Sequence, residues 1–172
     1  MNWRRTWIGV LLVLPFIGLL ALGFGTDPHA VPFVLKGEDA PSFSLQSIKG
    51  KTVGLEDYRG KPIVMNFWAS WCEPCKLEHQ LLQNAARRFA ADVVFLGVVY
   101  QDTPEAAQKF LARHGNQMTQ LLDPDSKTAI DYGVSGVPES FFINRQSKVT
   151  YKEPGVLRPE RLFSELKKIM RN

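Results

Sequence analysis

The chain contains two kinds of apolar pattern beyond its N-terminal segment. Residues 62–69 and 92–100 are apolar at nearly every position and have the length of a strand, which is typical of strands buried on both faces of a sheet. Between them, apolar residues recur at helical spacing and predict a helix from about Cys72 to Ala90. These residues are Leu77, Leu81, Leu82, Ala85 and Phe89. The pattern therefore predicts a buried strand, a helix and a second buried strand in succession.

The rest of the chain completes a predicted α/β domain. Its further elements are, in chain order, a hairpin around residues 43–45 and 52–55, a helix over 104–114, a short helix around 126–132, short strands at 140–144 and 148–152, and a C-terminal helix that opens with Pro159. Thr103 is the expected N-cap of the helix over 104–114, and Gly115 its end. This order of elements makes an α/β sandwich in which helices flank a mixed central sheet.

The N-terminal segment differs from the rest because residues 7–24 contain no charged side chain. Their length is close to what a bilayer requires, and two arginines precede them, so we expect one transmembrane helix with a cytoplasmic N-terminus. A cleaved signal peptide is the alternative, but no clear cleavage site follows the apolar run. We expect an anchor or uncleaved signal at 1–25, a tether at 26–37 and one domain at 38–172. The domain would lie on the periplasmic side of the cytoplasmic (inner) membrane.

The charge of the chain argues against a role in nucleic-acid binding. Its 21 Lys and Arg residues are nearly matched by 17 Asp and Glu residues, which leaves a formal net charge of +4. The charges are scattered along the sequence and form no basic stripe. The sequence therefore predicts that the chain does not bind nucleic acid.

Cys72 and Cys75 are the only two cysteines, and such a pair can staple the chain, hold a metal or react. A staple is least favoured, because closing so short a loop gains little stability. Cys72 falls where a strand gives way to a helix, whose N-terminus favours the nucleophilic thiolate. Cys75 lies about one turn further on, within reach of a disulfide formed at Cys72. The positions favour redox chemistry, with Cys72 exposed and nucleophilic and Cys75 shielded.

The segments around the cysteines resemble a known family. Residues 71–79 (WCEPCKLEH), 133–141 (GVSGVPESF) and 37–45 (GEDAPSFSL) are similar to the membrane-anchored thioredoxin-like oxidoreductases of cytochrome c maturation, the DsbE or CcmG type with ResA and TlpA as relatives. The resemblance covers about residues 37–170 and implies a thioredoxin-like fold with an N-terminal hairpin extension. It implies reduction of a disulfide in apocytochrome c or another protein, a membrane electron donor of the DsbD or CcdA kind, and no cofactor besides the redox-active Cys72–Cys75 disulfide.

The resemblance also suggests supporting residues on both sides of the cysteines. Val137 and Pro138 match the cis-proline loop that faces the cysteines in this fold, where the backbone of Val137 can pair with a substrate peptide. Trp71, Glu73 and Pro74 belong to the active-site motif itself. Pro74 suits the first turn of a helix, because no backbone N–H is needed there.

Two glutamates are further candidates. Asn66 stands where thioredoxin carries a buried aspartate, so Glu78, three residues after Cys75 on the same helix face, is the candidate proton relay. Its carboxylate would disfavour a thiolate on Cys75. The alternative for Glu78 is a solvated helix residue. Glu139 directly follows the proline and either shapes the substrate groove or is an ordinary charge at a strand edge.

Other functions remain open at this stage. Cys72, Cys75 and His79 could bind copper or zinc in a metallochaperone, although no fourth ligand is evident. Peroxidases with a similar lead-in place a threonine three residues before the reactive cysteine, and here Ala69 occupies that position. Haem attachment would need histidine in place of Lys76. A general periplasmic disulfide reductase is the alternative with the same chemistry.

Overall fold

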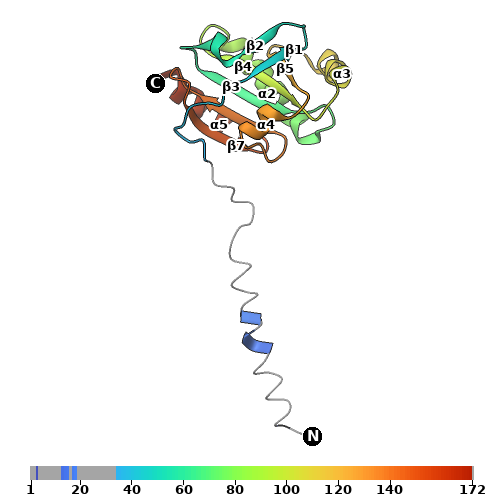
Figure 1. The fold of residues 1–172 in the computed structure, drawn as a ribbon, viewed down its shortest axis with the longest axis vertical. Coiled ribbons are helices and arrows are strands. Elements are labelled where there is room, and N and C mark those ends of the chain that lie inside the picture. Colours follow the sequence, from blue (N-terminus) through green and yellow to red (C-terminus); the bar gives the residue numbers. More distant parts are fainter. Residues whose placement is uncertain (1–2, 4–12, 16, 19–33, 172) are drawn as a thin grey trace. The chain divides into compact units, whose positions relative to one another are not determined.

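The computed structural model describes residues 34–171, together with residue 3, residues 13–15 and residues 17–18. The chain divides into two units, Met1–Phe33 and Val34–Asn172, and the second contains the folded domain (Figure 1). Most of the predicted membrane anchor and residues 26–33 of the predicted tether lie outside the described residues. Within the part of the chain that is described, no helix is long and apolar enough to cross a membrane.

A seven-stranded mixed sheet in the order β2-β1-β5-β4-β3-β6-β7 forms the centre of the domain. Its strands are β1 (Ser44–Ser47), β2 (Thr52–Gly54), β3 (Ile63–Trp68), β4 (Val94–Tyr100), β5 (Thr119–Asp123), β6 (Glu139–Ile143) and β7 (Val149–Pro154). β3 is parallel to β4 and β4 to β5, whereas all other neighbours are antiparallel. The mixed central sheet predicted from the sequence is confirmed.

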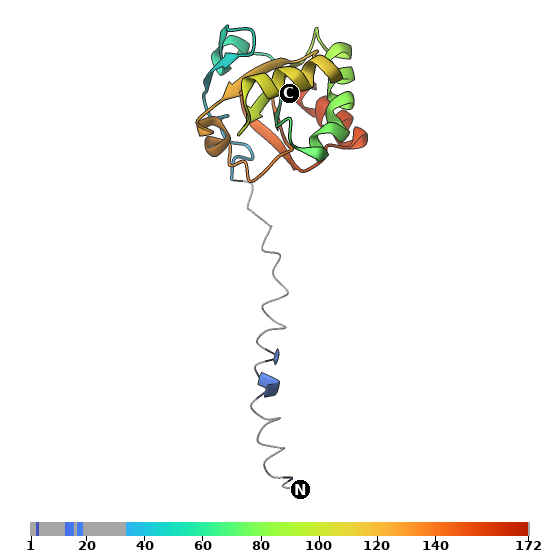
Figure 2. The same cartoon turned by 90° about the vertical axis from the view of Figure 1, so that its right-hand side faces the viewer.

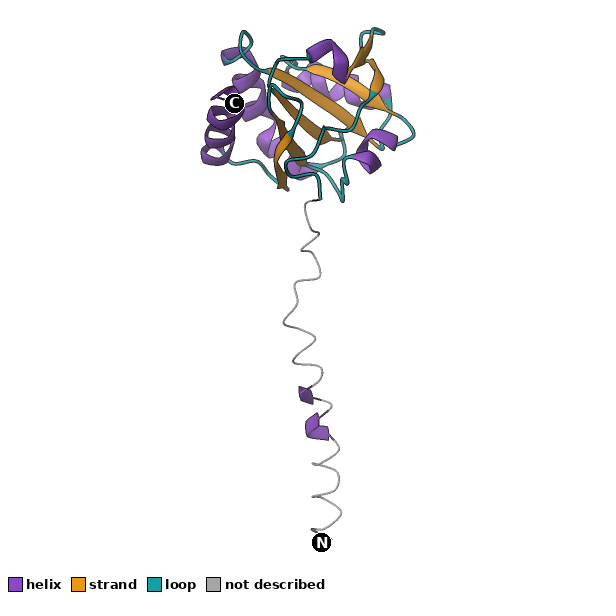
Figure 3. Ribbon diagram, turned by 60° about the vertical axis from the view of Figure 1, so that its left-hand side comes forward, coloured by secondary structure: helices purple, strands orange, loops and turns teal. Residues whose placement is uncertain are grey.

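Helices cover both faces of this sheet (Figures 2 and 3). They are α2 (Glu73–Arg88), α3 (Pro104–His114), α4 (Lys127–Asp131) and α5 (Pro159–Arg171), with a short 3-10 helix, η1, at Leu55–Tyr58. Trp68 of β3 packs in one cluster with side chains of α3, while the ring of the preceding Phe67 lies 5.8 Å from that of Tyr132 at the end of α4. Since successive strand residues point to opposite faces, α3 and α4 lie on opposite sides. A second cluster joins α2 and α5 to Val64, which shares the face of Trp68.

The central position of β3 determines where the cysteines lie. All six residues of β3 are buried, as its uninterrupted apolar run predicts. Its carboxyl end leads into α2, and its antiparallel neighbour β6 begins at the same edge, because Phe67 pairs with Glu139. The start of α2 and the loop before β6 are therefore brought together by the topology of the sheet.

Strand β5 was not predicted from the sequence. Its polar residues are buried because they have partners elsewhere in the fold. Gln120 Oε1 accepts a hydrogen bond from Trp68 Nε1 at 2.8 Å, and the Asp123 carboxylate accepts from two backbone N–H groups in the first turn of α4. A pattern of apolar residues cannot show these partners, so the segment resembles a loop in the sequence.

Candidate active site

The cysteine pair lies where β3 gives way to α2. Cys72 is the N-cap of α2, and its Sγ accepts a hydrogen bond from the backbone N–H of Cys75 at 3.1 Å. Pro74 occupies the first turn, where its missing N–H leaves no hydrogen bond unmade. The two sulfurs form a disulfide, with the Cα atoms 5.3 Å apart. A disulfide at a helix N-terminus can exchange with a thiol, because the helix end stabilises a thiolate released at Cys72.

The expectation that Cys72 is exposed and Cys75 shielded is wrong for this disulfide form. Each cysteine is 3% exposed. Both pack in an apolar cluster with Trp68 and Ala69, against which the partly buried Val137 also lies. In the disulfide form both cysteines lie in this cluster, so overall burial does not distinguish them.

Trp71 and Glu73 lie at the surface around the disulfide. Trp71 is 54% exposed, and its Nε1 donates a hydrogen bond to the backbone carbonyl of Gln101 at 3.0 Å. Glu73 pairs with Lys76 on the exposed side of the first turn of α2. An exposed aromatic ring beside a reactive disulfide suits contact with a partner protein.

The loop before β6 has the expected cis bond between Val137 and Pro138. Val137 packs against the cluster that contains both cysteines, and Pro138 is buried. The carbonyl of Pro138 accepts a hydrogen bond from Gly155 N at 2.8 Å, which ties the loop to the end of β7. The structure thus places Val137 of the proline loop against the apolar cluster that contains the disulfide.

Glu78 lies inside the protein, so the alternative of a solvated helix residue is wrong. Its side chain comes from α2, and the residue is only 1% exposed. Its Oε1 accepts a hydrogen bond from Asn66 Nδ2 at 2.7 Å, and its Oε2 accepts one from Leu157 N at 2.5 Å. Asn66 Nδ2 also donates to Ser140 Oγ at 3.0 Å. The carboxyl is therefore held by β3 and by the segment between β7 and α5, and Asn66 links it to β6.

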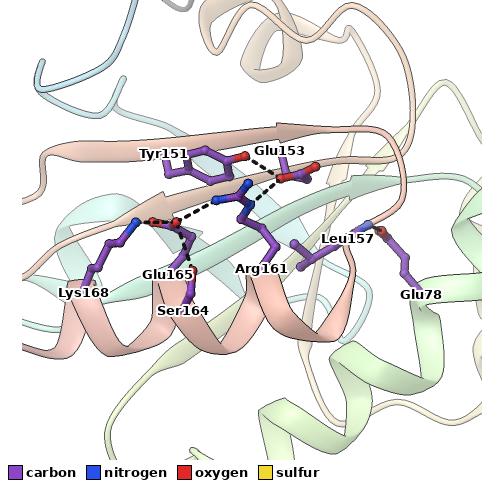
Figure 4. A network of polar contacts seen from close by, with 8 residues as sticks. All are labelled: Glu78, Tyr151, Glu153, Leu157, Arg161, Ser164, Glu165 and Lys168. Carbon is purple, nitrogen blue, oxygen red and sulfur yellow. Dashed lines mark hydrogen bonds and ion pairs between the residues drawn. The ribbon is translucent and has the colours of Figure 1, made fainter.

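Burial raises the pKa of Glu78 to about 7, against the opposing effect of the hydrogen bonds from Leu157 and Asn66. The nearby charge of Glu153 on β7 raises this pKa further. Figure 4 shows Glu78 and Leu157 beside the polar network that contains Glu153, whose carboxylate accepts from Tyr151 at 2.6 Å and pairs with Arg161 at 3.5 Å. A carboxyl with a pKa near 7 can both take and release a proton at neutral pH.

Glu139 is also buried, so the alternative of an ordinary strand-edge charge is wrong. β6 lies between β3 and β7, and Glu139 is 2% exposed. Its Oε1 accepts from Ser135 Oγ at 2.6 Å, and its Oε2 lies 2.8 Å from Lys152 Nζ. Lys152 Nζ also donates to the carbonyl of Gly133 at 2.7 Å. These contacts fasten both ends of the loop that contains Val137 and Pro138.

Comparisons with known proteins agree with this geometry. A family model described as the AhpC/TSA family matches residues 36–152. The chain belongs to the AhpC/TSA family. Within it, the chain is similar to proteins named for thiol:disulfide exchange.

Three such proteins show how far the likeness extends. The thiol:disulfide interchange protein HelX of Rhodobacter capsulatus is 36% identical over 157 residues, which cover 86% of this chain and 88% of HelX. The thiol-disulfide oxidoreductase ResA of Bacillus subtilis is 35% identical, covering 90% of this chain and 87% of ResA. A crystal structure from Chlorobium tepidum, described as a thiol:disulfide interchange protein DsbE, superposes with a TM-score of 0.73 and 31% identity, over 78% of this chain and 97% of that one. The predicted thioredoxin-like fold and the predicted class, a thiol:disulfide oxidoreductase, are confirmed.

The structure of this AhpC/TSA member adds Gln83, Gln120 and Asp102 to the site residues predicted from the sequence. A polar cavity of about 10 Å³ lies beside Cys75 and is also lined by Asn66, Gln83 and Gln120. Asp102 Oδ2 accepts from the backbone N–H of Ser70 at 2.6 Å and holds the loop before Cys72. Neither contact has a signal in the sequence, because the partners lie many residues apart.

The side chain of His79 contacts α3 and the residue after it, whereas a metallochaperone would use this side chain as a metal ligand. Its Nε2 donates to the carbonyl of Gly115 at 3.0 Å, and its ring lies 5.0 Å from that of Phe110. Burial lowers the pKa of His79. Among the residues that the structure describes, no group of three or more His, Cys, Asp or Glu side chains could hold a metal. The geometry thus gives His79 a packing role between α2 and α3.

Proposed function

We propose that the chain is a membrane-tethered disulfide reductase that acts on an exported protein, and that apocytochrome c is this protein. The observation that carries the proposal is the Cys72–Cys75 disulfide at the start of α2, with the buried carboxyl of Glu78 one helical turn beyond it. Such a site combines a nucleophile at a helix end with a group that exchanges protons near neutral pH.

The first step forms a mixed disulfide. In the reduced protein, the thiolate of Cys72 attacks one sulfur of the substrate disulfide, and the other substrate sulfur leaves as a thiolate. The proline loop supports this step, because Val137 packs against the apolar cluster that contains the cysteines and its backbone can pair with an extended substrate segment. The exposed ring of Trp71 offers an apolar contact to the same partner.

The second step releases the reduced substrate. Cys75 loses its proton to the carboxylate of Glu78, and its thiolate attacks the Sγ of Cys72. The bond between Cys72 and the substrate breaks, and the second substrate sulfur leaves as a thiolate. The substrate has then gained two electrons, and the protein ends as the disulfide seen here. A membrane donor of the DsbD or CcdA kind would restore the dithiol with two electrons from its own thiol pair. Its thiolate would attack Cys72, Cys75 would leave as a thiolate and regain the proton from Glu78, and the second donor thiol would then release Cys72 and leave the donor as a disulfide.

The proposed location follows from the N-terminal sequence. Residues 1–25 would anchor the chain in the cytoplasmic membrane, residues 26–37 would form a tether, and residues 38–172 would form the periplasmic domain. The uncharged run at 7–24 and the arginines before it support this arrangement. A domain held at the membrane can meet both the electron donor and a substrate that has just been exported.

Trapping of the mixed disulfide tests the proposal. In a Cys75→Ser variant the intermediate has no internal resolving thiol, so we expect covalent complexes that survive non-reducing electrophoresis and contain apocytochrome c. Cys72→Ser is the matched control and should trap nothing, because it lacks the attacking thiolate. Complexes formed by Cys72→Ser alone would reverse the two roles. Complexes without any c-type cytochrome would support the general periplasmic reductase, and no complexes with either variant would overturn the proposal.

A further inference from the structure

Both oxygens of the Glu78 carboxyl accept hydrogen bonds, and both donors are nitrogen atoms. Oε1 faces Asn66 Nδ2 at 2.7 Å, and Oε2 faces the backbone N–H of Leu157 at 2.5 Å. An amide nitrogen has no acceptor capacity. This arrangement suits an ionised carboxylate, since every contact is made to a lone pair.

A protonated Glu78 would need a different arrangement, because its O–H must donate to an acceptor when it is buried. The backbone N–H of Leu157 cannot accept, which leaves Oε2 as the carbonyl oxygen and places the proton on Oε1. Asn66 can supply the acceptor, because its amide carries an oxygen on the same planar group. A half-turn of the amide exchanges its oxygen and nitrogen without moving the rest of the side chain.

The neighbour of Asn66 tolerates this exchange. Ser140 Oγ lies 3.0 Å from Asn66 Nδ2 and accepts its hydrogen bond. A hydroxyl can also donate, so after the half-turn Ser140 would donate to the amide oxygen. Both states of Glu78 would then have satisfied partners at 1% exposure.

We propose that Asn66 is a positioning residue that follows the proton on Glu78 by turning its side-chain amide, donating to the carboxylate and accepting from the carboxylic acid. The proposal deepens the function given above and rests on the role of Glu78 as proton acceptor. Asn66 and Cys75 line the same cavity. The half-turn therefore also exchanges the two ends of the amide beside the thiol that gives up the proton.

The groups that hydrogen-bond to Glu78 are neutral, so they must respond when its charge changes. Glu153 from β7 is the charged group that acts on Glu78, and Arg161 from α5 pairs with Glu153. The side-chain hydrogen bond to Glu78 comes from Asn66 of β3, which also bonds Ser140 of β6, and the backbone hydrogen bond comes from Leu157. Since no cation among the described residues is bonded to Glu78, the change in charge has to be met by reorganised hydrogen bonds.

Side-chain amide NMR of the oxidised protein tests the proposal directly, since its cysteines do not titrate. We expect the Asn66 Nδ2H₂ resonances to shift with pH at the midpoint of the Glu78 carboxyl, which lies near 7. Contacts from these protons to Glu78 and Ser140, present at high pH, should disappear at low pH. Asn144, whose side chain bonds backbone N–H groups in the β6–β7 turn, is the internal reference and should not move at that midpoint.

A Glu78→Gln variant provides the second measurement. Its side chain would accept from Leu157 through the oxygen and donate through the nitrogen, so it should hold Asn66 in the turned orientation at every pH. We expect the low-pH pattern of the wild-type protein at pH 8 as well. Asn66 resonances that ignore the Glu78 midpoint, or a variant that keeps the high-pH contacts, would overturn the inference. Neither outcome depends on the substrate, so failure here is distinct from failure of the trapping experiment.

Discussion

Two glutamates lie buried near the disulfide, Glu78 on α2 and Glu139 on β6, with exposures of 1% and 2%. Glu139 has a cation beside it, since Lys152 Nζ lies 2.8 Å from its Oε2. Glu78 has neutral donors, Asn66 and the backbone of Leu157. The same residue type thus has the same burial and a different electrostatic environment.

This difference explains the raised pKa of Glu78 and gives Glu139 a structural role in holding the loop before Pro138. Burying a carboxylate without a cation is costly, and the cost is avoided when the group takes a proton. Burial accordingly raises the pKa of Glu78 to about 7. The charge of Glu139 is balanced by Lys152, which also binds the Gly133 carbonyl and so closes the loop before Pro138. Burial alone therefore does not identify a proton relay. The charge of the groups bonded to the buried carboxyl distinguishes Glu78 from Glu139.

Removing the cation from Glu139 should have the largest effect. A Lys152→Met variant leaves a buried carboxylate without its partner, and we expect the free energy of unfolding to fall by about 3–5 kcal/mol. Chemical denaturation of the oxidised protein at neutral pH measures this loss. Lys148→Met is the matched control, because its ion pair with Asp39 is exposed and should contribute less than about 1 kcal/mol. Equal losses in the two variants would show that the buried pair has no special role.

Glu78 should make stability depend on pH in the opposite sense from an ion-paired carboxyl. Its pKa rises from 4.5 in the unfolded chain to about 7 in the folded protein, so the folded state binds the proton more tightly. The resulting stabilisation is complete below pH 4.5 and is lost as the pH rises through 7.

Comparison with Glu78→Gln isolates this contribution. Relative to the variant, the wild-type protein should lose about 3 kcal/mol of unfolding free energy between about pH 4 and about pH 8. Denaturation of both oxidised proteins across this range gives the difference. A difference that stays constant with pH would mean that Glu78 does not titrate in the folded protein as its burial requires.

The smallest effect should come from Glu153, which acts on Glu78 through its charge alone. A Glu153→Gln variant removes a negative charge and should lower the pKa of Glu78 by less than about one pH unit, because Arg161 already offsets that charge. The carboxyl carbon resonance of Glu78, followed against pH, measures the shift. Glu160→Gln on the first turn of α5 is a control at an exposed carboxylate. An upward shift in Glu153→Gln would contradict the electrostatic account.

The local pattern determined much of the site in advance. The apolar run before Cys72 predicted a central strand, and the periodicity after it predicted a helix, so the N-terminal position of Cys72 on α2 followed from the sequence. The three-residue spacing from Cys75 placed Glu78 on the same helix face. These features depend on neighbours in the chain, and periodicity records such neighbours directly.

The tertiary structure alone decided how the carboxyls behave. Glu78 meets Leu157, which lies 79 residues further along the chain, and Asn66 meets Ser140 at a separation of 74 residues. Strand β5 was missed for the same reason, since its buried polar residues bond to other elements. Whether a buried carboxyl can transfer protons or forms a structural ion pair depends on desolvation and on nearby charge. Both are properties of the assembled core, because chain folding brings the donors and the cation together.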